Sequence, residues 1–309
     1  MIKPTIKQLE YFSAVAETLH FRKAAEQLNV SQPTLSDQVK ELEYRLGVVL
    51  LDRTRHGVEL TPVGREILNR TTFLLRDLND LCDHAKTAKS MLGGTLRLGV
   101  APTVGPYLLP YVLPDLHRDY PDLKLYIRED RSSSLEQALR TGHHDLILTA
   151  LPLEDDGLRT EVLFSEPLMV GLPKNHRLAM ADSVAPQDLR GEAVLSLGAG
   201  HRLYEQVQEL CREFGADLQN DYEGTSLDTL RQMVGMEMGI SFFPNLYARS
   251  EITKDPEVCA RPIETRVVKR QVGLAWRSNS PRINEFLQFK EDLLRSLNRQ
   301  ISHEVMLSG

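Results

Sequence analysis

The 309-residue chain contains few cysteines and few aromatic residues, and it has no long apolar run. Its three cysteines, Cys82, Cys211 and Cys259, are too few and too scattered for a disulfide framework or a four-ligand zinc site. No stretch approaches the roughly 20 apolar residues of a membrane helix, and the first residues lack the features of a secretory signal. We therefore expect a protein of the reducing cytoplasm, without a metal or other cofactor.

The chain also lacks an excess of positive charge, because 37 Lys and Arg residues against 43 Asp and Glu residues give a net charge of −6. This sum argues at first against a nucleic-acid partner. The charge is unevenly distributed, however: residues 1–92 carry 13 basic and 12 acidic side chains, whereas residues 93–309 carry 24 and 31. Any surface that attracts anions is therefore expected near the N-terminus. The length predicts two or three globular domains.

Three short helices are predicted in the first fifty residues. The first runs from Gln8 to Leu19 and the second from Phe21 to Leu28. After a tight turn, Ser31 is expected to cap a third helix that ends at Gly47. The predicted apolar stripes are Leu9, Phe12, Val15, Ala16 and Leu19 on the first helix, and Leu35, Val39, Leu42 and Leu46 on the third.

The outward face of the third helix begins with short hydrogen-bonding side chains, as in helices that contact base edges in the major groove. A hairpin is predicted around Gly57, and its basic residues suit phosphates or the minor groove. The residues expected to contact DNA are Ser31, Gln32, Pro33, Thr34, Ser36, Gln38 and Lys40 on the helix, and Arg53 and Arg55 on the hairpin. Periodicity alone leaves a small helical domain with an ordinary polar face as an equal alternative.

A long helix is expected after Thr61-Pro62, which form a typical helix start. Its apolar residues recur at steps of three and four over about four heptads, which favours pairing in a coiled coil over packing on the same domain. The seam consists of Val63, Ile67, Thr71, Leu74, Leu78, Leu81, Ala85, Ala88 and Leu92. Two-fold pairing predicts a pseudo-palindromic DNA site. Cys82 lies one residue off the seam and is interpreted as incidental.

After Gly93-Gly94 the pattern changes to alternating strands and helices, which is typical of an α/β fold. A helix interrupted by prolines is expected at residues 104–121. The chain is expected to cross between two α/β lobes near residues 163–168 and 266–270. The predicted fold class is α/β overall, with a winged helix-turn-helix in residues 1–61, a linker helix in 62–92 and a two-lobed effector domain in 93–309.

In folds of this class, ligands bind beyond the carboxyl ends of strands and against helix N-termini. This rule selects Thr103, Ser132, Ser133, Thr225 and Ser226, together with the segment 198–201. Hydroxyls and free N–H groups that converge on a cleft suit a small anion such as a carboxylate. For any one of these residues, an ordinary helix cap is the alternative.

The segment AAEQLNVSQPTLSDQVKELEYRLGVVLLDRTRHGVELTPVG is similar to the winged helix-turn-helix of LysR-type transcriptional regulators. This resemblance implies a sequence-specific regulator that binds double-stranded DNA and responds to a small effector. It also implies a dimerisation helix in residues 62–92 and, over residues 95–300, an effector domain like the periplasmic binding proteins. Tetramers that bend DNA are implied as well, and RNA polymerase is a further candidate partner.

Within that family, the resemblance is strongest to the peroxide-sensing OxyR branch, in APTVGPYLLPYVLPDLH and EGTSLDTLRQMVGMEMGISFFP. That branch uses a reactive cysteine directly after a histidine and a second cysteine nine residues later. Here His201 and Cys211 align with the histidine and the second cysteine, and Arg202 occupies the reactive position. Because the attacking sulfur is absent, we expect His201 and Arg202 to hold an acidic effector instead. An oxidant response through Cys211 or Cys259 is the alternative, although Cys211 is expected to be buried and unreactive.

An enzyme on the two-lobed fold is a remote alternative. No GxSxG elbow, P-loop or dinucleotide motif stands in the strand–turn–helix context that its chemistry needs. The pair His143-His144 precedes a strand, where neighbouring side chains point to opposite faces and cannot easily share a metal ion. The sequence therefore predicts a protein that is not an enzyme, and it identifies neither the effector nor the direction of regulation.

Overall fold

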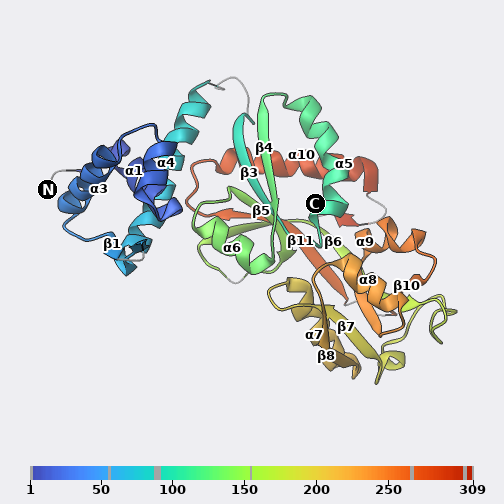
Figure 1. The fold of residues 1–309 in the computed structure, drawn as a ribbon. Coiled ribbons are helices and arrows are strands. Elements are labelled where there is room, and N and C mark those ends of the chain that lie inside the picture. The colour runs from blue at the N-terminus through green and yellow to red at the C-terminus, as the bar shows by residue number, and fades with distance from the viewer. Residues whose placement is uncertain are drawn as a thin grey trace. The chain divides into compact units, whose positions relative to one another are not determined.

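The computed structural model describes residues 3–54, 57–86, 92–153, 155–264, 268–301 and 305–307, and the chain divides into two compact units, Met1–Ala88 and Lys89–Gly309. We call them the N-terminal unit and the C-terminal unit. The N-terminal unit contains three helices, a two-stranded hairpin and a fourth, longer helix (Figure 1). Their bounds are α1 (Ile6–Thr18), α2 (Phe21–Gln27), α3 (Gln32–Leu46), β1 (Leu51–Thr54), β2 (Gly57–Leu60) and α4 (Pro62–Lys86).

The ends of α1 and α3 follow from local residue chemistry. Thr5 and Gln8 form a reciprocal capping box at the start of α1. Gly47 ends α3 in the left-handed conformation, with φ of 71°, which costs glycine little. Leu19 was wrongly predicted to belong to the apolar stripe of α1. It follows the last helical residue with φ of 49° and is exposed, and Tyr11 is buried in its place.

The seam predicted for α4 remains partly uncovered in the single chain. Thr71 is buried, whereas Leu74 and Leu81 are exposed. Leu92, expected to close the seam, instead packs in the core of the C-terminal unit next to Leu96. The reason is that β3 begins at Gly94, so the chain already belongs to the second unit at residue 92. Ala88 and the rest of 87–91 lie outside the described residues.

The C-terminal unit has two lobes that share one long strand, β6 (Leu158–Pro173). The strand order is β4-β3-β5-β11-β6-β9-β7-β8, with β10 and β12 also paired to β6. Residues 158–167 of β6 pair with β11, and residues 168–173 pair with β9 and β10. The expected crossing near residues 163–168 is therefore confirmed. The second expected crossing, at 266–270, falls partly outside the described residues; Lys269 begins β11.

Lobe I consists of the sheet on the β11 side of β6 and the helices that cover it (Figure 1). An added Cβ on Gly99 would meet Leu135 of α6, and one on Gly105 of α5 would meet Val100, so successive residues of β3 face α6 and α5 alternately. The elements are β3 (Gly94–Val100), α5 (Gly105–Asp119), β4 (Leu123–Glu129), α6 (Ser132–Arg140), β5 (Leu146–Leu151), β11 (Lys269–Arg277), α10 (Ile283–Ile301) and β12 (Met306–Leu307).

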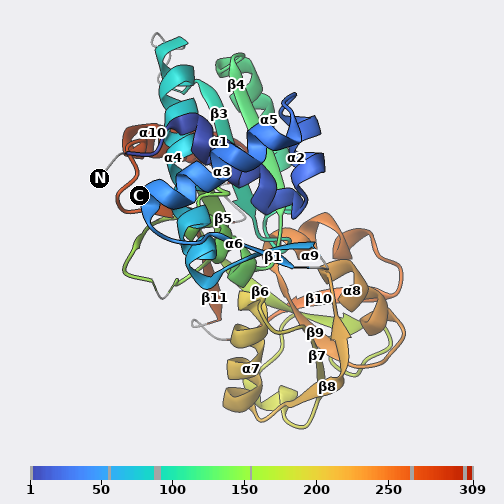
Figure 2. The ribbon, with the colours of Figure 1, turned by 60° about the vertical axis from the view of Figure 1, so that its left-hand side comes forward.

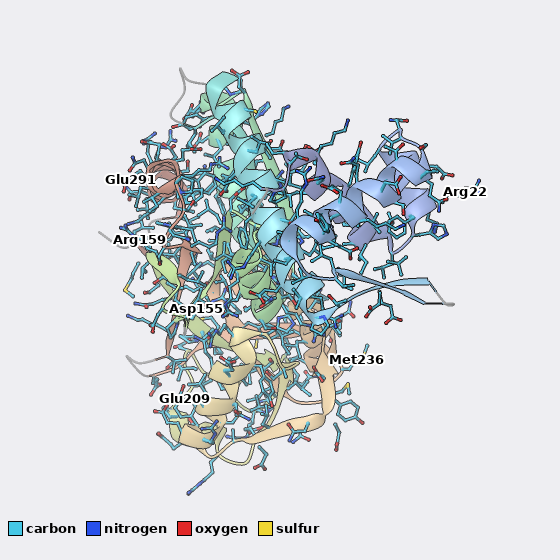
Figure 3. The ribbon with its side chains drawn as sticks, turned by 90° about the vertical axis from the view of Figure 1, so that its left-hand side faces the viewer. Arg22, Asp155, Arg159, Glu209, Met236 and Glu291 are labelled. Carbon is cyan, nitrogen blue, oxygen red and sulfur yellow. The ribbon has the colours of Figure 1, made fainter. Side chains whose placement is uncertain are left out.

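Lobe II surrounds a second apolar core. Figure 2 shows its strands and helices. In α7 the apolar residues point inward, whereas Glu209 points to solvent (Figure 3). The elements are η1 (Pro186–Leu189), β7 (Ala193–Leu197), α7 (Arg202–Phe214), β8 (Asp217–Gly224), α8 (Leu227–Gly235), β9 (Ile240–Pro244), α9 (Asn245–Ser250), η2 (Ile252–Lys254) and β10 (Val258–Pro262).

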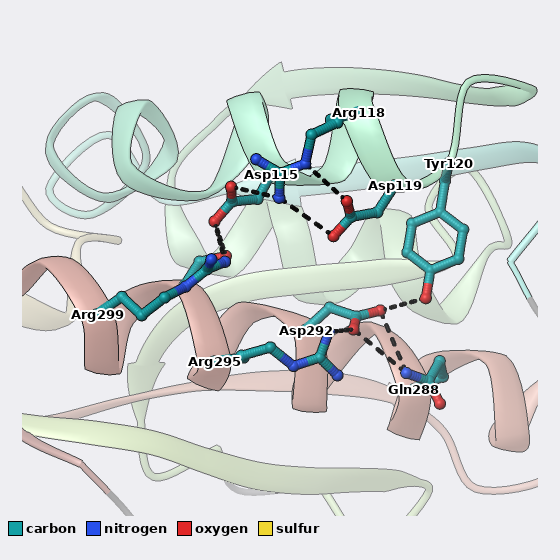
Figure 4. Close-up of polar contacts among 9 residues, drawn as sticks. Asp115, Arg118, Asp119, Tyr120, Gln288, Asp292, Arg295 and Arg299 are labelled. Atoms are coloured by element: carbon teal, nitrogen blue, oxygen red, sulfur yellow. Dashed lines mark hydrogen bonds and ion pairs between the residues drawn. The ribbon is translucent and has the colours of Figure 1, made fainter.

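Helix α5 continues through its prolines, contrary to the predicted interruption. Pro106, Pro110 and Pro114 recur every four residues on the exposed side, where water can satisfy the carbonyls that lose their helical partners. On the other side, Asp115 of α5 accepts a hydrogen bond from the Ser296 hydroxyl of α10 at 2.7 Å and pairs with Arg299 at 2.6 Å (Figure 4). None of the described helices is long and apolar enough to cross a membrane.

Candidate functional site

The first candidate surface is the start of α3. The Ser31 hydroxyl accepts a hydrogen bond from the Thr34 backbone N–H at 3.2 Å and lies 2.7 Å from the Thr34 hydroxyl, so it caps the helix as expected. Gln32, Pro33, Thr34 and Lys40 are exposed. The capped first turn thus presents an amide, a hydroxyl and the positive end of a helix dipole, which suit base edges and phosphates.

Two other residues predicted on this face are partly turned inward. Ser36 and Gln38 are half-buried, and the side-chain carbonyl of Gln38 accepts a hydrogen bond from the side-chain amide of buried Gln8 at 3.3 Å. Gln38 therefore helps to hold α3 against α1, and its NH₂ group is the part left for DNA. The DNA contact of these residues stays a prediction.

The hairpin follows α3 through a buried leucine pair. Leu50 and Leu51 donate their backbone N–H groups to the Glu43 carboxylate at 2.7 and 3.1 Å, which fixes the start of β1 to the third helix. Arg53 lies on β1 opposite Val58. Arg55 lies outside the described residues.

The second candidate surface is the boundary between the lobes, where the loop before α7 meets the start of α6. Ser133 donates its backbone N–H to the Gly200 carbonyl at 3.4 Å, and Arg131 donates to the Ala199 carbonyl at 3.5 Å. Gly200 has φ of 92°, and a Cβ there would come within 3.1 Å of the Ser133 hydroxyl oxygen. This close backbone approach therefore favours glycine at residue 200.

His201 and Arg202 stand at this boundary as the sequence predicts. His201 is buried, and its pKa is lowered mainly by burial and also by the charge of Arg131, so the neutral imidazole is favoured. Arg202 of lobe II pairs with Glu205 at 2.8 Å and with Glu136 of lobe I at 3.6 Å. The guanidinium thus already has carboxylate partners, one of which lies across the boundary.

Ser132 and Thr103 are buried on the lobe I side. The hydroxyls of Ser132 and Thr149 lie 3.2 Å apart. Arg270 donates to the hydroxyl and the carbonyl of Thr103 at 3.1 and 2.7 Å. Both residues therefore have protein partners, and Thr149 is a neighbour that the sequence rule missed because it lies inside a strand.

Arg270 also forms a fully buried ion pair with Glu166 at 2.7 Å. Glu166 accepts a further hydrogen bond from the backbone N–H of Leu246 in lobe II at 2.8 Å. Sequence reasoning missed both charges, although each falls in a segment expected to cross between the lobes. A charged residue within an apolar strand predicts a buried partner, but nothing in the sequence says which residue it is.

The remaining predicted effector residues lie at the start of α8. Ser226 caps α8 by accepting a hydrogen bond from the Thr229 backbone N–H at 3.1 Å, so the alternative of an ordinary cap applies to it. Thr225 is exposed. Directly before them, the Gly224 carbonyl accepts a hydrogen bond at 3.3 Å from the Gly198 N–H of the loop before α7. A role for either in effector binding stays a prediction.

All three cysteines are free thiols, and their environments differ. Cys82 is exposed, Cys211 is buried in the core of lobe II, and Cys259 is half-buried on β10. Burial raises the pKa of Cys211 to about 11. It also raises the pKa of Cys259, although Arg261 and Lys174 oppose the shift. Neither Cys211 nor Cys259, the two cysteines of the C-terminal unit, therefore has the low pKa of a reactive thiol.

A capped helix-turn-helix with a hairpin, joined by a long helix to a two-lobed α/β unit, defines a DNA-binding regulator with a sensor domain. The comparisons with known families agree. Residues 6–65 match the bacterial regulatory helix-turn-helix protein of the lysR family, and residues 89–297 match the LysR substrate binding domain. The chain belongs to the LysR family of DNA-binding transcriptional regulators, which bind small effectors in the second domain and form oligomers.

Several relatives are OxyR proteins or hydrogen peroxide-inducible genes activators. The chain is 38% identical to the DNA-binding transcriptional dual regulator OxyR of Escherichia coli, over 93% of each chain. The structure is similar to a full-length OxyR from Pseudomonas aeruginosa with a cysteine-to-aspartate substitution, with a TM-score of 0.79, 34% identity and 100% coverage of both chains. It is also similar to a hydrogen-peroxide-bound OxyR mutant from Corynebacterium glutamicum, with a TM-score of 0.67, 33% identity and 97% and 95% coverage. The predicted family and branch are thus confirmed.

Proposed function

We propose that the C-terminal unit of this regulator responds to a small anionic effector held at the lobe boundary, and not to peroxide attack at residue 202. The observation that carries this proposal is Arg202, which stands directly after a buried histidine and pairs with carboxylates. A guanidinium cannot act as a sulfur nucleophile, but it recognises a carboxylate in a bidentate manner. The proposed effector residues are Thr103, Ser132, Ser133, His201, Arg202, Thr225 and Ser226.

The pair between Arg202 and Glu136 suggests how such an effector changes the protein. An effector carboxylate at Arg202 competes with Glu136, which belongs to the other lobe. Burial raises the pKa of Glu136, and Arg202 and Arg140 oppose this shift, so losing Arg202 makes protonation of Glu136 easier. Effector binding therefore exchanges an interlobe contact for a ligand contact, which gives the two states different affinities for the ligand.

Isothermal titration of the full chain with a panel of mono- and dicarboxylic acids tests this proposal. An acid that binds the wild type should bind R202A at least tenfold more weakly. R212A is the matched control, because Arg212 lies on the same helix and its guanidinium donates to the Gln208 side chain of that helix. Unchanged binding by R202A, or equal loss in R212A, would contradict the proposed role of Arg202.

The N-terminal unit is proposed to read a pseudo-palindromic site as a pair held together by α4. Leu74 and Leu81 support pairing because both are exposed on one helix at a spacing of seven residues, as in a coiled-coil seam. L74E/L81E should lower the oligomeric mass in multi-angle light scattering and weaken DNA binding. Exchanging the charges of the exposed pair Glu66 and Arg70 on the same helix, as E66K/R70E, is the control, and no change in mass is expected. A variant that stays fully paired would exclude this seam.

Base reading is assigned to Gln32 and Thr34, and phosphate contact to Arg53 and Arg55. Q32A should lose about 1–3 kcal/mol of affinity for its own operator and relax the choice of base at one position, as measured by anisotropy and by selection from random DNA. R53Q should weaken binding to all sequences and flatten the dependence on salt. Q187A, an exposed change in η1, is the control. Equal binding of Q32A to all selected sites would contradict base reading.

Further properties rest on the same proposal. The proposed DNA-binding, pairing and sensing parts are residues 1–61, 62–92 and 93–309, although Leu92 at the end of the pairing part already packs in the core of the C-terminal unit. We propose that the protein acts in the cytoplasm on DNA, as a dimer that assembles into tetramers and with RNA polymerase as a partner, and that it has no catalytic activity.

An oxidant response is the second candidate function, because the relatives include hydrogen peroxide-inducible genes activators. In this chain it would use Cys211 or Cys259. The raised pKa of both thiols places this candidate second. Mass spectrometry of peroxide-treated protein distinguishes the oxidant response from the effector response. Oxidation of either cysteine together with altered DNA binding would favour the oxidant response, provided that C211S or C259S abolishes both changes.

A further inference from the structure

Lobe I carries a groove of about 920 Å³ that lies beside α6, on the face of the sheet that α6 covers. The groove is bordered by α6 on one side and by the edge strand β4 on the other. It exists because α6 spans only nine residues and packs over β5, β3 and β11. No helix among the described residues covers the same face of β4, and Tyr126 on that strand is 62% exposed.

The strand register brings two arginines onto the wall of this groove. Arg97 pairs across the ladder with Tyr126, and Gly99 pairs with Arg128, so all four residues share one face of the sheet. Arg97 and Arg128 are then diagonal neighbours, about 8 Å apart at their Cα atoms for strand spacings of about 4.8 and 3.3 Å. Gly99 adds no side chain between them, and the space above it is taken by the His144 ring.

These two arginines differ from most others in the C-terminal unit. Arg118, Arg140, Arg159, Arg177, Arg231 and Arg282 each pair with a carboxylate. Within the part of the chain that the structure describes, neither guanidinium of Arg97 and Arg128 has an ion-pair partner. The Nη1 atom of Arg97 is also buried from water and has no hydrogen-bond partner there. A buried cationic donor without a partner is unfavourable, so an anion would stabilise it.

The rest of the lining suits the same kind of ligand. His143 and His144 line the groove, and the hydroxyls of Ser134 and Thr141 and the amide of Gln137 add hydrogen-bonding groups. Among the described residues that line the groove, Asp130 is the only acidic one, and its carboxylate accepts the Arg131 backbone N–H at 2.8 Å. This local excess of basic groups occurs in residues 93–309, which are acidic overall, with 24 basic against 31 acidic side chains.

We propose that this groove is a second ligand site for a small polyanion that carries at least two phosphate or carboxylate groups; of the proposed effector residues, it shares Ser133. Arg97 and Arg128 bind different anionic groups of the ligand, and the hydroxyls and amide of α6 complete the contacts. Bidentate guanidinium bonds suit both phosphate and carboxylate oxygens. Because Arg97 is recessed and Arg128 is exposed, a polyanion bridges the two better than a single small anion. The inference does not depend on the proposed role of Arg202.

Isothermal titration of the full chain at low salt tests the site, with pyrophosphate and citrate as the two polyanion probes and acetate as the monovalent comparison. We expect pyrophosphate or citrate to bind with a dissociation constant at least tenfold below that of acetate, and the stronger of the two identifies phosphate or carboxylate chemistry. R97Q/R128Q should raise the dissociation constant at least tenfold. R190Q, an exposed arginine of lobe II, should leave it unchanged.

A second variant guards against misfolding of the double arginine variant. Q137E adds one charge to the groove without changing side-chain size, and it should also weaken polyanion binding. Q187E adds the same charge outside the groove and should not. The proposal is overturned if neither polyanion binds at millimolar concentration, if Q137E binds like Q187E, or if R202A alone removes the binding. It is also overturned if R97Q/R128Q weakens only DNA binding, since the groove would then be a nucleic-acid contact.

Discussion

The two units of the molecule assemble their functional side chains in opposite ways. In the N-terminal unit, the candidate DNA contacts on α3 all lie within ten consecutive residues, from Ser31 to Lys40. In the C-terminal unit, Thr103 is held by Arg270, which lies 167 positions later in the chain, and Glu166 is bonded to a backbone group 80 positions later. A local helix pattern determines the first surface, whereas the second depends on strands that cross between lobes. Experiments can measure how independent the two arrangements are.

The largest effect is expected at the buried ion pair of the C-terminal unit. R270M leaves the Glu166 carboxylate buried without its charged partner, and we expect the unfolding free energy of this unit to fall by about 3–5 kcal/mol. Urea unfolding followed by the fluorescence of Trp276, the single tryptophan of the chain, reports this unit alone. The helices of the N-terminal unit should unfold as in the wild type.

R299M provides the control for R270M, because Arg299 also pairs with a carboxylate but is half-exposed. Exposed pairs contribute at most about 1 kcal/mol. If R270M lowered the unfolding free energy of the C-terminal unit no more than R299M does, the stability of the crossing strands would not depend on the buried pair. Unfolding of the N-terminal unit by R270M would remove the distinction between the two units.

The next effect concerns the thiols. With a pKa of about 11, Cys211 has about a hundredth of the thiolate that a thiol of pKa 9.0 has at neutral pH. We therefore expect iodoacetamide to modify exposed Cys82 of the N-terminal unit first, Cys259 later and Cys211 last, by about a hundredfold in rate relative to a free thiol. Peptide mass spectrometry of timed samples measures the order. Early modification of Cys211 would favour the oxidant response over the effector response.

The two units share one matched feature, a serine that caps a helix three residues before its backbone partner. Ser31 caps α3 and Ser226 caps α8 with N–H to hydroxyl distances of 3.2 and 3.1 Å. S31A and S226A should each cost about 0.5–2 kcal/mol, seen as faster amide exchange in that helix alone. Only S31A should also weaken DNA binding. Equal loss of DNA affinity in both variants would show that the units are tightly coupled.

The smallest effect is a pH dependence from His201. Because burial lowers its pKa below the ordinary 6.5, the unfolded chain binds a proton before the folded chain does as the pH falls. The stability that His201 contributes is fully present above pH 6.5, and it is lost as the pH falls through the lower pKa of His201 in the folded protein. Unfolding of the C-terminal unit at about pH 7.5 and about pH 5.5 should therefore differ more for the wild type than for H201Q. Identical differences would exclude His201 as the source.

The N-terminal unit was largely predictable because its determinants are local. Ser31, Pro33 and Gly47 mark the ends of α3 through backbone chemistry that needs no distant residue. Even there, the inward bond of Gln38 to Gln8 was missed, since it depends on how two helices face each other. Leu19 was misplaced because an apolar residue just beyond a helix end continues the spacing without belonging to the helix.

In the C-terminal unit the sequence predicted elements better than partners. Strand ends and helix starts located Ser132 and His201, and the resemblance to the OxyR branch drew attention to Arg202, which pairs across the lobe boundary. The partners of these residues, Thr149, Glu136 and Glu205, carry no distinguishing local pattern. The groove beside α6 was not predicted at all, because it results from the shortness of one helix and the register of β3 on β4.

The order of the strands has a consequence for how the protein is made. β11 lies between β5 and β6 in the sheet, yet it is the last long strand to leave the ribosome. The sheet of lobe I therefore lacks its central strand until almost the whole chain has been synthesised. Until then, the edge of β6 that pairs with β11 has no partner strand. The N-terminal unit needs none of these late residues and can fold much earlier. Each new molecule thus has its DNA-reading helix before it has a finished sensor, and the interval between the two events is set by the translation rate of the second unit.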